Sequence, residues 1–338
     1  MRVFGVIAAK LRDLNGIPID DVDDVLVTNG GIHGLYILCL SLLDPGDEVL
    51  IPDPAWPPAA GNILAARGVP VGYRLYESKG WQPDLDEVEA AITPKTRVLY
   101  INSPSNPTGG VLTLAYLERL AAIAHQHDLW VISDEAYEDV VFEGEHISIA
   151  SLPGMYKRTF PLYTFSKSYA VTGLRLGYIA IRDAKIRDRA KKILFYTASN
   201  VSSVVQYGGI GALEGPQDCI EAFRTELRER RDLFYRGIDE SAGGVLSGQS
   251  PAGAFYAFVK IDPSWNEGDP STGSGQVPSE SLSWRMVEYL IKNGRIGCVP
   301  GVDFGANGEG YVRFCFARDR KELTGALDSM KQLFGVRV

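Results

Sequence analysis

Apolar residues occur along this chain in two rhythms: short continuous runs, and longer segments in which they recur every three or four positions. From Leu26 to about Phe165 the two rhythms alternate. This alternation predicts strands joined by crossover helices, and therefore a parallel sheet in an α/β fold. The predicted strands, rich in β-branched and aromatic residues, are 48–51, 69–75, 97–102, 129–133 and 160–165.

The segment 113–127 shows the helical rhythm, with Thr113 in the N-cap position. The run 129–133 that follows is apolar almost throughout, so we expect it in the middle of the sheet with helices on both faces. Asp134, which ends this run, would then lie at the edge of the sheet where ligands bind. The apolar positions of the preceding helix are Leu114, Leu117, Leu120, Ala121 and Ala124.

Beyond Gly177 the pattern changes to helices, and then to a mixture of strands and helices. The fold class we predict is a three-layer α/β sandwich with a mostly parallel central sheet, followed by a smaller α+β domain. We place the large domain at 1–222 and the small one at 223–338, connected by a long charged helix. Residues 263–280 are rich in Pro, Gly and Ser and predict a mobile surface loop, either a lid or a plain excursion. The predicted elements are helices at 185–196, 204–213, 217–240 and 281–292, strands at 253–261, 296–299 and 311–317, and a final helix.

Composition narrows the class of protein. Among 338 residues, 45% are hydrophobic and 22% charged, which is ordinary globular usage and excludes a disordered chain. The net charge of −8 without a basic run argues against nucleic acid as a partner. No apolar run reaches the roughly 18 residues of a membrane span, and no signal peptide is recognisable, so we expect a cytoplasmic protein. The four cysteines and four histidines lack metal-ligand spacing, so we expect no metal site, reduced thiols, and solvated or capping histidines.

A lysine carries the strongest chemical indication. Lys167 follows the strand 160–165 and is flanked by Phe165 and Tyr169. Apolar surroundings lower the pKa of a lysine and make its neutral amine a nucleophile for carbonyls. The Thr164 hydroxyl and the Arg175 guanidinium can meanwhile hold a phosphate. A Schiff-base lysine beside a phosphate site predicts pyridoxal 5′-phosphate as the cofactor, whereas the plainer alternative is a surface lysine beside a polar turn.

Three motifs, read together, resemble those of the class I/II aminotransferases, the pyridoxal phosphate-dependent enzymes of fold type I that include aspartate aminotransferase. They are NSPSNPTG at 102–109, DEAY at 134–137 and SKSYAVTGLRLG at 166–177. The resemblance covers essentially the whole chain. It implies an enzyme that moves the amino group of an L-amino acid to a 2-oxo acid in two half reactions through a Lys167 Schiff base. We expect this enzyme to be a homodimer.

The resemblance also implies a role for each matching residue. Lys167 would hold the cofactor and carry the proton, and Asp134 would pair with the ring nitrogen. Tyr137 and Asn106 would donate hydrogen bonds to the phenolic oxygen of the ring. Arg313 would hold the substrate carboxylate in a bidentate pair, and Asn106 would also bind the substrate. Taken alone, Asp134 and Asn106 are common turn residues, and Arg313 could be a salt-bridged strand residue.

Five positions concern the binding of the cofactor. Gly30 and Gly31 open a predicted helix, whose first amides and dipole form an anion site for the cofactor phosphate. Ile32 stands where the family commonly has Ser or Thr, which removes one hydroxyl and leaves the amide. Trp56 aligns with the aromatic residue that stacks on the cofactor ring, although it could equally be plain core. Thr164 is a milder departure from the family, which prefers Ser or Gly there.

The family normally has several dozen residues before the helix that here is predicted to begin near Val6. Those residues usually contribute to substrate closure, to the small domain and to the dimer. One alternative is therefore a protein that binds the cofactor with reduced activity. The other is a β-lyase or cyclising synthase of the same fold, because the same cofactor chemistry can expel a leaving group.

Overall fold

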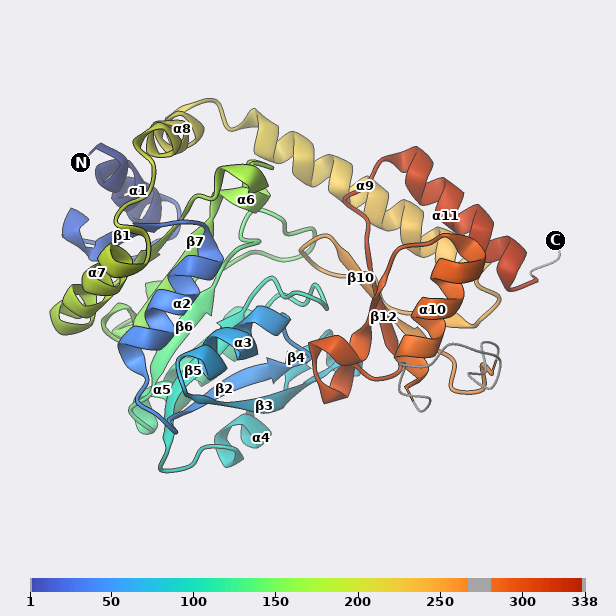
Figure 1. The fold of residues 1–338 in the computed structure, drawn as a ribbon, viewed down its shortest axis with the longest axis horizontal. Helices are drawn as coiled ribbons and strands as arrows, with labels where there is room; N and C mark the ends of the chain where they lie inside the picture. The colour runs from blue at the N-terminus through green and yellow to red at the C-terminus, as the bar shows by residue number, and fades with distance from the viewer. Residues whose placement is uncertain (1, 267–280, 336–338) are drawn as a thin grey trace.

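The computed structural model describes residues 2–266 and 281–335, which form two β-sheets with their helices (Figure 1). The first sheet contains eight strands. The strand order is β1-β8-β7-β6-β5-β2-β3-β4. Neighbours from β7 to β3 pair in parallel, whereas β8 is antiparallel to both β7 and β1, and β4 to β3. The strands are β1 Val25–Thr28, β2 Glu48–Asp53, β3 Val69–Tyr76, β4 Gln82–Pro83, β5 Thr96–Asn102, β6 Trp130–Asp134, β7 Thr159–Thr164 and β8 Gly177–Ala180.

Helices cover both faces of this sheet, as predicted. In β6, Ile132 joins a buried cluster with residues of one set of helices, and its neighbour Val131 joins a different cluster that contains residues of α5. Alternate side chains of a strand point to opposite faces, so the central strand is buried on both sides. The first set is α2 Gly31–Leu42, α3 Pro57–Ala65 and α7 Ala184–Ala198; the remaining helices of this part are α1 Arg2–Asp13, α4 Leu85–Ala90, α5 Leu114–Gln126, α6 Phe165–Ser168 and α8 Ser203–Glu214.

The five predicted strands of this sheet are confirmed to within two residues, and several details are corrected. Two of its strands, β1 and β8, lie at the antiparallel edge and were not predicted as separate strands, because each is only four residues long. Thr113 is at the N-cap of α5 but its side chain makes no capping bond. Leu114 is exposed, because it lies in the first turn beyond the edge of the core. Helix α1 begins by Arg2 rather than near Val6.

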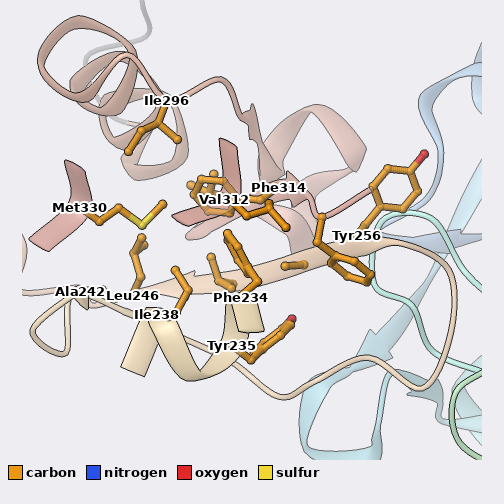
Figure 2. Close-up of a cluster of buried hydrophobic side chains, with 14 of the residues drawn as sticks. Phe234, Tyr235, Ile238, Ala242, Leu246, Tyr256, Ile296, Val312, Phe314 and Met330 are labelled. Carbon is orange, nitrogen blue, oxygen red and sulfur yellow. The ribbon is translucent and has the colours of Figure 1, made fainter. Parts of the chain in front are cut away.

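The second sheet has the order β11-β12-β10-β9, all antiparallel, and packs against three helices. Figure 2 shows its core, in which the rings of Phe234 and Phe314 lie 5.4 Å apart between centroids. The predicted strand 296–299 is reduced to Val299–Pro300, since only these residues pair with β12. The elements are β9 Leu246–Ser247, β10 Tyr256–Ile261, β11 Val299–Pro300, β12 Tyr311–Cys315, α9 Asp218–Ser241, α10 Leu282–Gly294 and α11 Arg320–Leu333.

Helix α9 runs from the first sheet's helices to the second sheet (Figure 1). The predicted boundary between residues 222 and 223 lies inside this continuous helix and stays a prediction. Of the predicted loop 263–280, residues 267–280 are outside the described part of the chain. Of the described residues, Trp265 is buried in the core of the second sheet, whereas residues 263, 264 and 266 are exposed, so the surface loop stays a prediction.

Small residues let the two parts approach each other closely. The Gly253 amide, just before β10, donates a hydrogen bond to the Gly109 carbonyl at 2.9 Å. Gly109 has a φ of +69°, and a Cβ there would collide with Pro251. A Cβ at Gly253 would lie 2.9 Å from the Cβ of Pro104. Only glycine permits this approach, which brings the start of β10 against the loop that carries Asn106.

Candidate active site

One cavity, of about 220 Å³, lies at the carboxyl ends of the central strands β5, β6 and β7. Parallel sheets bind ligands at this edge. Nine of the eleven residues predicted from the sequence line the cavity: Gly31, Ile32, Trp56, Asn106, Asp134, Tyr137, Thr164, Lys167 and Arg175. The other two, Gly30 and Arg313, contact residues of the lining. The residues that sequence reasoning missed are Asn102, Ala136, Leu162, Ser166, Thr172 and Tyr256.

Lys167 lies in the one-turn helix α6, directly after β7. Its Nζ lies 5.4 Å from the ring centroids of both Tyr137 and Phe255, and within the described chain it has no salt bridge or hydrogen bond. Desolvation by these surroundings lowers the pKa of the Lys167 ammonium. The amine is therefore deprotonated more readily than that of a surface lysine, as a carbonyl nucleophile requires.

Asp134 ends β6 and is 4% exposed. One carboxylate oxygen accepts a hydrogen bond from the Tyr100 hydroxyl at 2.8 Å, and the other accepts one from the Ala136 amide at 3.2 Å. Burial nevertheless raises the pKa of Asp134 to about 6, because desolvation outweighs these hydrogen bonds and the charge of Lys167, and no cation of the described chain forms a salt bridge with Asp134. A protonated ring nitrogen would supply the missing positive charge.

The other buried acids of the described chain have such partners. Asp24 pairs with Arg187 and Arg182, and Glu138 pairs with Lys10. Glu135, adjacent to Asp134, pairs with His146 at 2.9 Å, which holds the pKa of Glu135 below its usual value. This corrects the expectation of a solvated or capping His146, whose side chain is only 9% exposed. The sequence analysis missed this pair because Glu135 and His146 are eleven residues apart and come together only when the chain folds.

A cradle suited to a phosphate lies at the start of α2. Gly30 has a φ of +79°, and the Arg175 guanidinium packs on it so closely that a Cβ there would lie 2.9 Å from the Arg175 Cζ. A Cβ on Gly177 would lie 2.7 Å from the Gly31 nitrogen, so that position also requires glycine. The Arg175 Nη1 donates to the Thr172 carbonyl at 3.0 Å, and no carboxylate of the described residues pairs with it.

The residues beside this cradle differ in the groups that they can present to the cofactor. The Thr164 hydroxyl caps α6 by accepting a hydrogen bond from the Ser166 amide at 3.2 Å, and both residues line the cavity. Ile32 is 40% exposed and offers only its amide to an anion. Trp56 precedes α3, lines the cavity, and also packs against the core of the first sheet. It can therefore contact the cofactor and be part of the core at the same time.

The second sheet contributes a cation. Arg313, in β12, donates a hydrogen bond from Nη1 to the Asn106 side-chain oxygen at 2.9 Å. Its guanidinium lies 4.4 Å from the Tyr256 ring centroid and 4.7 Å from that of Phe304. Its Nε is buried without a partner, and no salt bridge with Arg313 occurs among residues 2–266 and 281–335. The predicted alternative of a salt-bridged strand arginine therefore fails for the described residues, and an anion would satisfy the group.

Hydrogen bonds connect the two walls. The backbone amide of Asn106 donates to the Asn102 side-chain oxygen at 2.9 Å, and the side-chain amide of Asn102 donates to the backbone carbonyl of Asp134 at 3.1 Å. The Tyr137 and Tyr256 hydroxyl oxygens lie 2.9 Å apart. The one sequence feature that could have indicated Tyr256 is the aromatic pair that follows Gly253 and Ala254.

These groups fit pyridoxal phosphate: a desolvated lysine for its aldehyde, a buried carboxylate for its ring nitrogen, and glycine amides with an arginine for its phosphate. A family model described as aminotransferase class I and II matches residues 6–330. The chain belongs to the class I and II aminotransferases. It is a pyridoxal phosphate-dependent aminotransferase.

The relatives of this aminotransferase agree. It is 36% identical over 330 residues to an aromatic-amino-acid aminotransferase 2 of Thermococcus litoralis and to an aspartate aminotransferase of Pyrococcus abyssi. Each match covers 97% of this chain and 80% of the relative. A crystal structure of an aromatic aminotransferase from Pyrococcus horikoshii OT3 matches with a TM-score of 0.89 and 36% identity, over 98% of this chain and 85% of that one. The predicted fold class and cofactor are confirmed.

No group of three or more His, Cys, Asp or Glu suited to a metal ion occurs among the described residues. None of the described helices is both long and apolar enough to cross a membrane.

Proposed function

We propose that this aminotransferase uses Lys167, Asp134 and Arg313 as its three charged working groups, and that its substrates are an aspartate-like or aromatic L-amino acid and a 2-oxo acid. One observation carries the proposal: Lys167 and Asp134 line one cavity, Arg313 contacts its lining residue Asn106, and within the described chain none of the three forms a salt bridge. The names of the relatives support the substrate class.

The cofactor supplies an aldehyde that links to amines and a ring that accepts electrons from the substrate's α-carbon. The chain's own residues do the rest. The Arg313 guanidinium holds the substrate carboxylate as a bidentate pair. Lys167 Nζ, whose pKa desolvation lowers, moves the proton between the α-carbon of the substrate and the aldehyde carbon of the cofactor.

Asp134 acts through its charge. As a carboxylate fixed by Tyr100 and the Ala136 amide, it stabilises a proton on the ring nitrogen of the cofactor. Asn106 and Tyr137 orient the ring through its phenolic oxygen. Arg175, with the amides at Gly31 and Ile32, holds the phosphate at the start of α2.

A homodimer and a cytoplasmic location are part of the proposal. Large apolar side chains are exposed on two neighbouring segments: Leu174, which adjoins the cavity-lining Arg175, and Val204 and Tyr207 of α8, whose Gly208 lies next to Leu174. Such a group of exposed apolar residues is typical of a subunit interface. The four cysteines are free, as in a reducing compartment.

The test is dependence on the 2-oxo acid. We expect purified protein with pyridoxal phosphate to convert L-aspartate or L-phenylalanine only when a 2-oxo acid is present, with one new amino acid formed for each one consumed. Release of pyruvate and ammonia or a thiol without a 2-oxo acid would instead indicate the β-lyase. No conversion despite tight cofactor binding would indicate the binding protein of reduced activity.

A further inference from the structure

Tyr256 is the one residue of the second sheet that lines the cavity. It begins β10 and pairs with Cys315 of β12, two residues from Arg313. Figure 2 shows it on the side of the core that faces the ribbons of the first sheet. Its side chain is buried and makes two different polar contacts, one through its hydroxyl and one through the face of its ring.

The hydroxyl contact leaves one hydrogen free. The Tyr137 and Tyr256 hydroxyls lie 2.9 Å apart, and each carries a single hydrogen. Only one hydrogen can lie between the two oxygens, so one hydroxyl donates and the other retains a hydrogen for a third group. No other hydrogen bond of either hydroxyl occurs in the described structure.

The surrounding charges decide which hydroxyl donates. The Arg313 guanidinium lies 4.4 Å from the Tyr256 ring centroid, and a cation makes the nearby phenol more acidic. Desolvation raises the pKa of Tyr256, whereas its hydrogen bond with Tyr137 and the positive charge of Arg313 lower it. At Tyr137, desolvation, the contact with Tyr256 and the negative charge of Asp134 raise the pKa, and Arg313 lowers it. The Arg313 guanidinium lies directly against the Tyr256 ring, and the more acidic phenol is the better donor, so this contact favours Tyr256 as the donor of the shared hydrogen.

We propose that Tyr256 is a positioning residue with two functions: its hydroxyl donates to Tyr137 and so turns the Tyr137 hydrogen toward the bound cofactor, while its ring supports the Arg313 guanidinium. The proposal rests on the proposed function. It assigns to one side chain of the second sheet an effect on both the cofactor and the substrate carboxylate. Accepting a hydrogen bond also makes Tyr137 a stronger donor, because linked hydrogen bonds polarise each other.

Two substitutions separate the functions. Tyr256→Phe removes the hydroxyl and retains the ring, so we expect pyridoxal phosphate to dissociate about fivefold more readily, with the KM for the amino acid unchanged. Tyr256→Leu removes the ring as well, so we expect the KM to rise in addition, by about fivefold. Tyr116→Phe, on helix α5, is the matched control for loss of a phenol.

The measurements are fluorescence titration with pyridoxal phosphate in the absence of substrate, and the pH titration of the visible absorption of the bound cofactor. We expect Tyr256→Phe to shift that titration in the same direction as Tyr137→Phe, and the double variant to match Tyr137→Phe alone. An unchanged dissociation constant and titration in Tyr256→Phe, or additive effects in the double variant, would overturn the proposal. If wild-type protein itself fails to bind the cofactor or to transaminate, the proposed function fails and not this inference alone.

Discussion

The first sheet contributes a buried carboxylate to the cavity, and the second contributes a guanidinium. Asp134 has two hydrogen-bond donors but no salt bridge, and Arg313 has an amide acceptor and two aromatic faces but no anion. Elsewhere in the described chain, the fully buried Asp24 and the largely buried Glu138 each form a salt bridge. The comparison distinguishes charged side chains that are paired within the fold from charged side chains whose counter-charge a ligand would supply. It also implies a division of labour between the sheets: residues of the first sheet bind the cofactor, and Arg313 of the second sheet binds the substrate carboxylate.

The largest effect is expected from Lys167→Ala. Transamination should fall by about 10³-fold or more, because the variant lacks both the nucleophile and the proton carrier. The assay is the rate of conversion of an amino acid with a 2-oxo acid. Lys192→Ala, on the exposed side of α7, is the control and should retain full activity. A Lys167→Ala rate within tenfold of wild type would exclude Lys167 as the working amine.

Asp134→Asn tests the unpaired carboxylate through stability. The pKa of Asp134 is raised in the cofactor-free protein from 3.8 to about 6, so the folded state binds the proton more tightly than the unfolded state. Stability is therefore lost as the pH rises from about 4 to about 6, by up to roughly 3 kcal/mol, and stays lower above that range.

The measurement for Asp134 is the free energy of unfolding in urea at pH 4.5 and pH 7.5. The decline from pH 4.5 to pH 7.5 should be smaller in cofactor-free Asp134→Asn than in wild type by roughly 2 kcal/mol, because about two thirds of the effect lies above pH 4.5. Saturation with pyridoxal phosphate should reduce the difference, because the ring nitrogen supplies the positive charge. Equal declines in both cofactor-free proteins would mean that Asp134 is already compensated within the chain.

Arg313→Gln tests the other side of the comparison. The KM for the amino acid should rise by about 10- to 100-fold, the range for loss of a charge-assisted bidentate pair. The dissociation constant of pyridoxal phosphate should change by less than threefold, since the cofactor is held by the first sheet. Arg318→Gln, whose partner is Glu322 on the surface, is the control. A parallel loss of cofactor affinity would contradict the division of labour.

The smallest effect concerns the phosphate cradle. Gly30→Ala places a methyl group against the Arg175 guanidinium at a position with φ of +79°, so cofactor affinity should fall by about tenfold. Gly46→Ala is a matched control, because Gly46 has a φ of +90° and nothing within 4 Å of the added Cβ. It also has a positive φ, but the added methyl group displaces no side chain. Equal losses in both variants would show that strain, rather than Arg175, is responsible.

The first sheet could be predicted from the sequence much better than the second. The motifs around Lys167 and Asp134 are local, since each working residue follows directly on a strip of apolar strand. Tyr100 and Tyr256 could not be found in this way. Their positions depend on which strands become neighbours, and an aromatic residue in a strand is ordinarily core. The salt bridge of Glu135 with His146 was missed for the same reason.

The most direct test of this division is borohydride reduction of the protein with bound pyridoxal phosphate, followed by mass spectrometry of its peptides. We expect the added pyridoxyl phosphate mass on the peptide that contains Lys167, and its loss when an amino acid is added before reduction. In Arg313→Gln the label on Lys167 should remain, whereas the protection by the amino acid should require about 10- to 100-fold more of it. A label on another lysine, or protection unchanged in Arg313→Gln, would contradict the account.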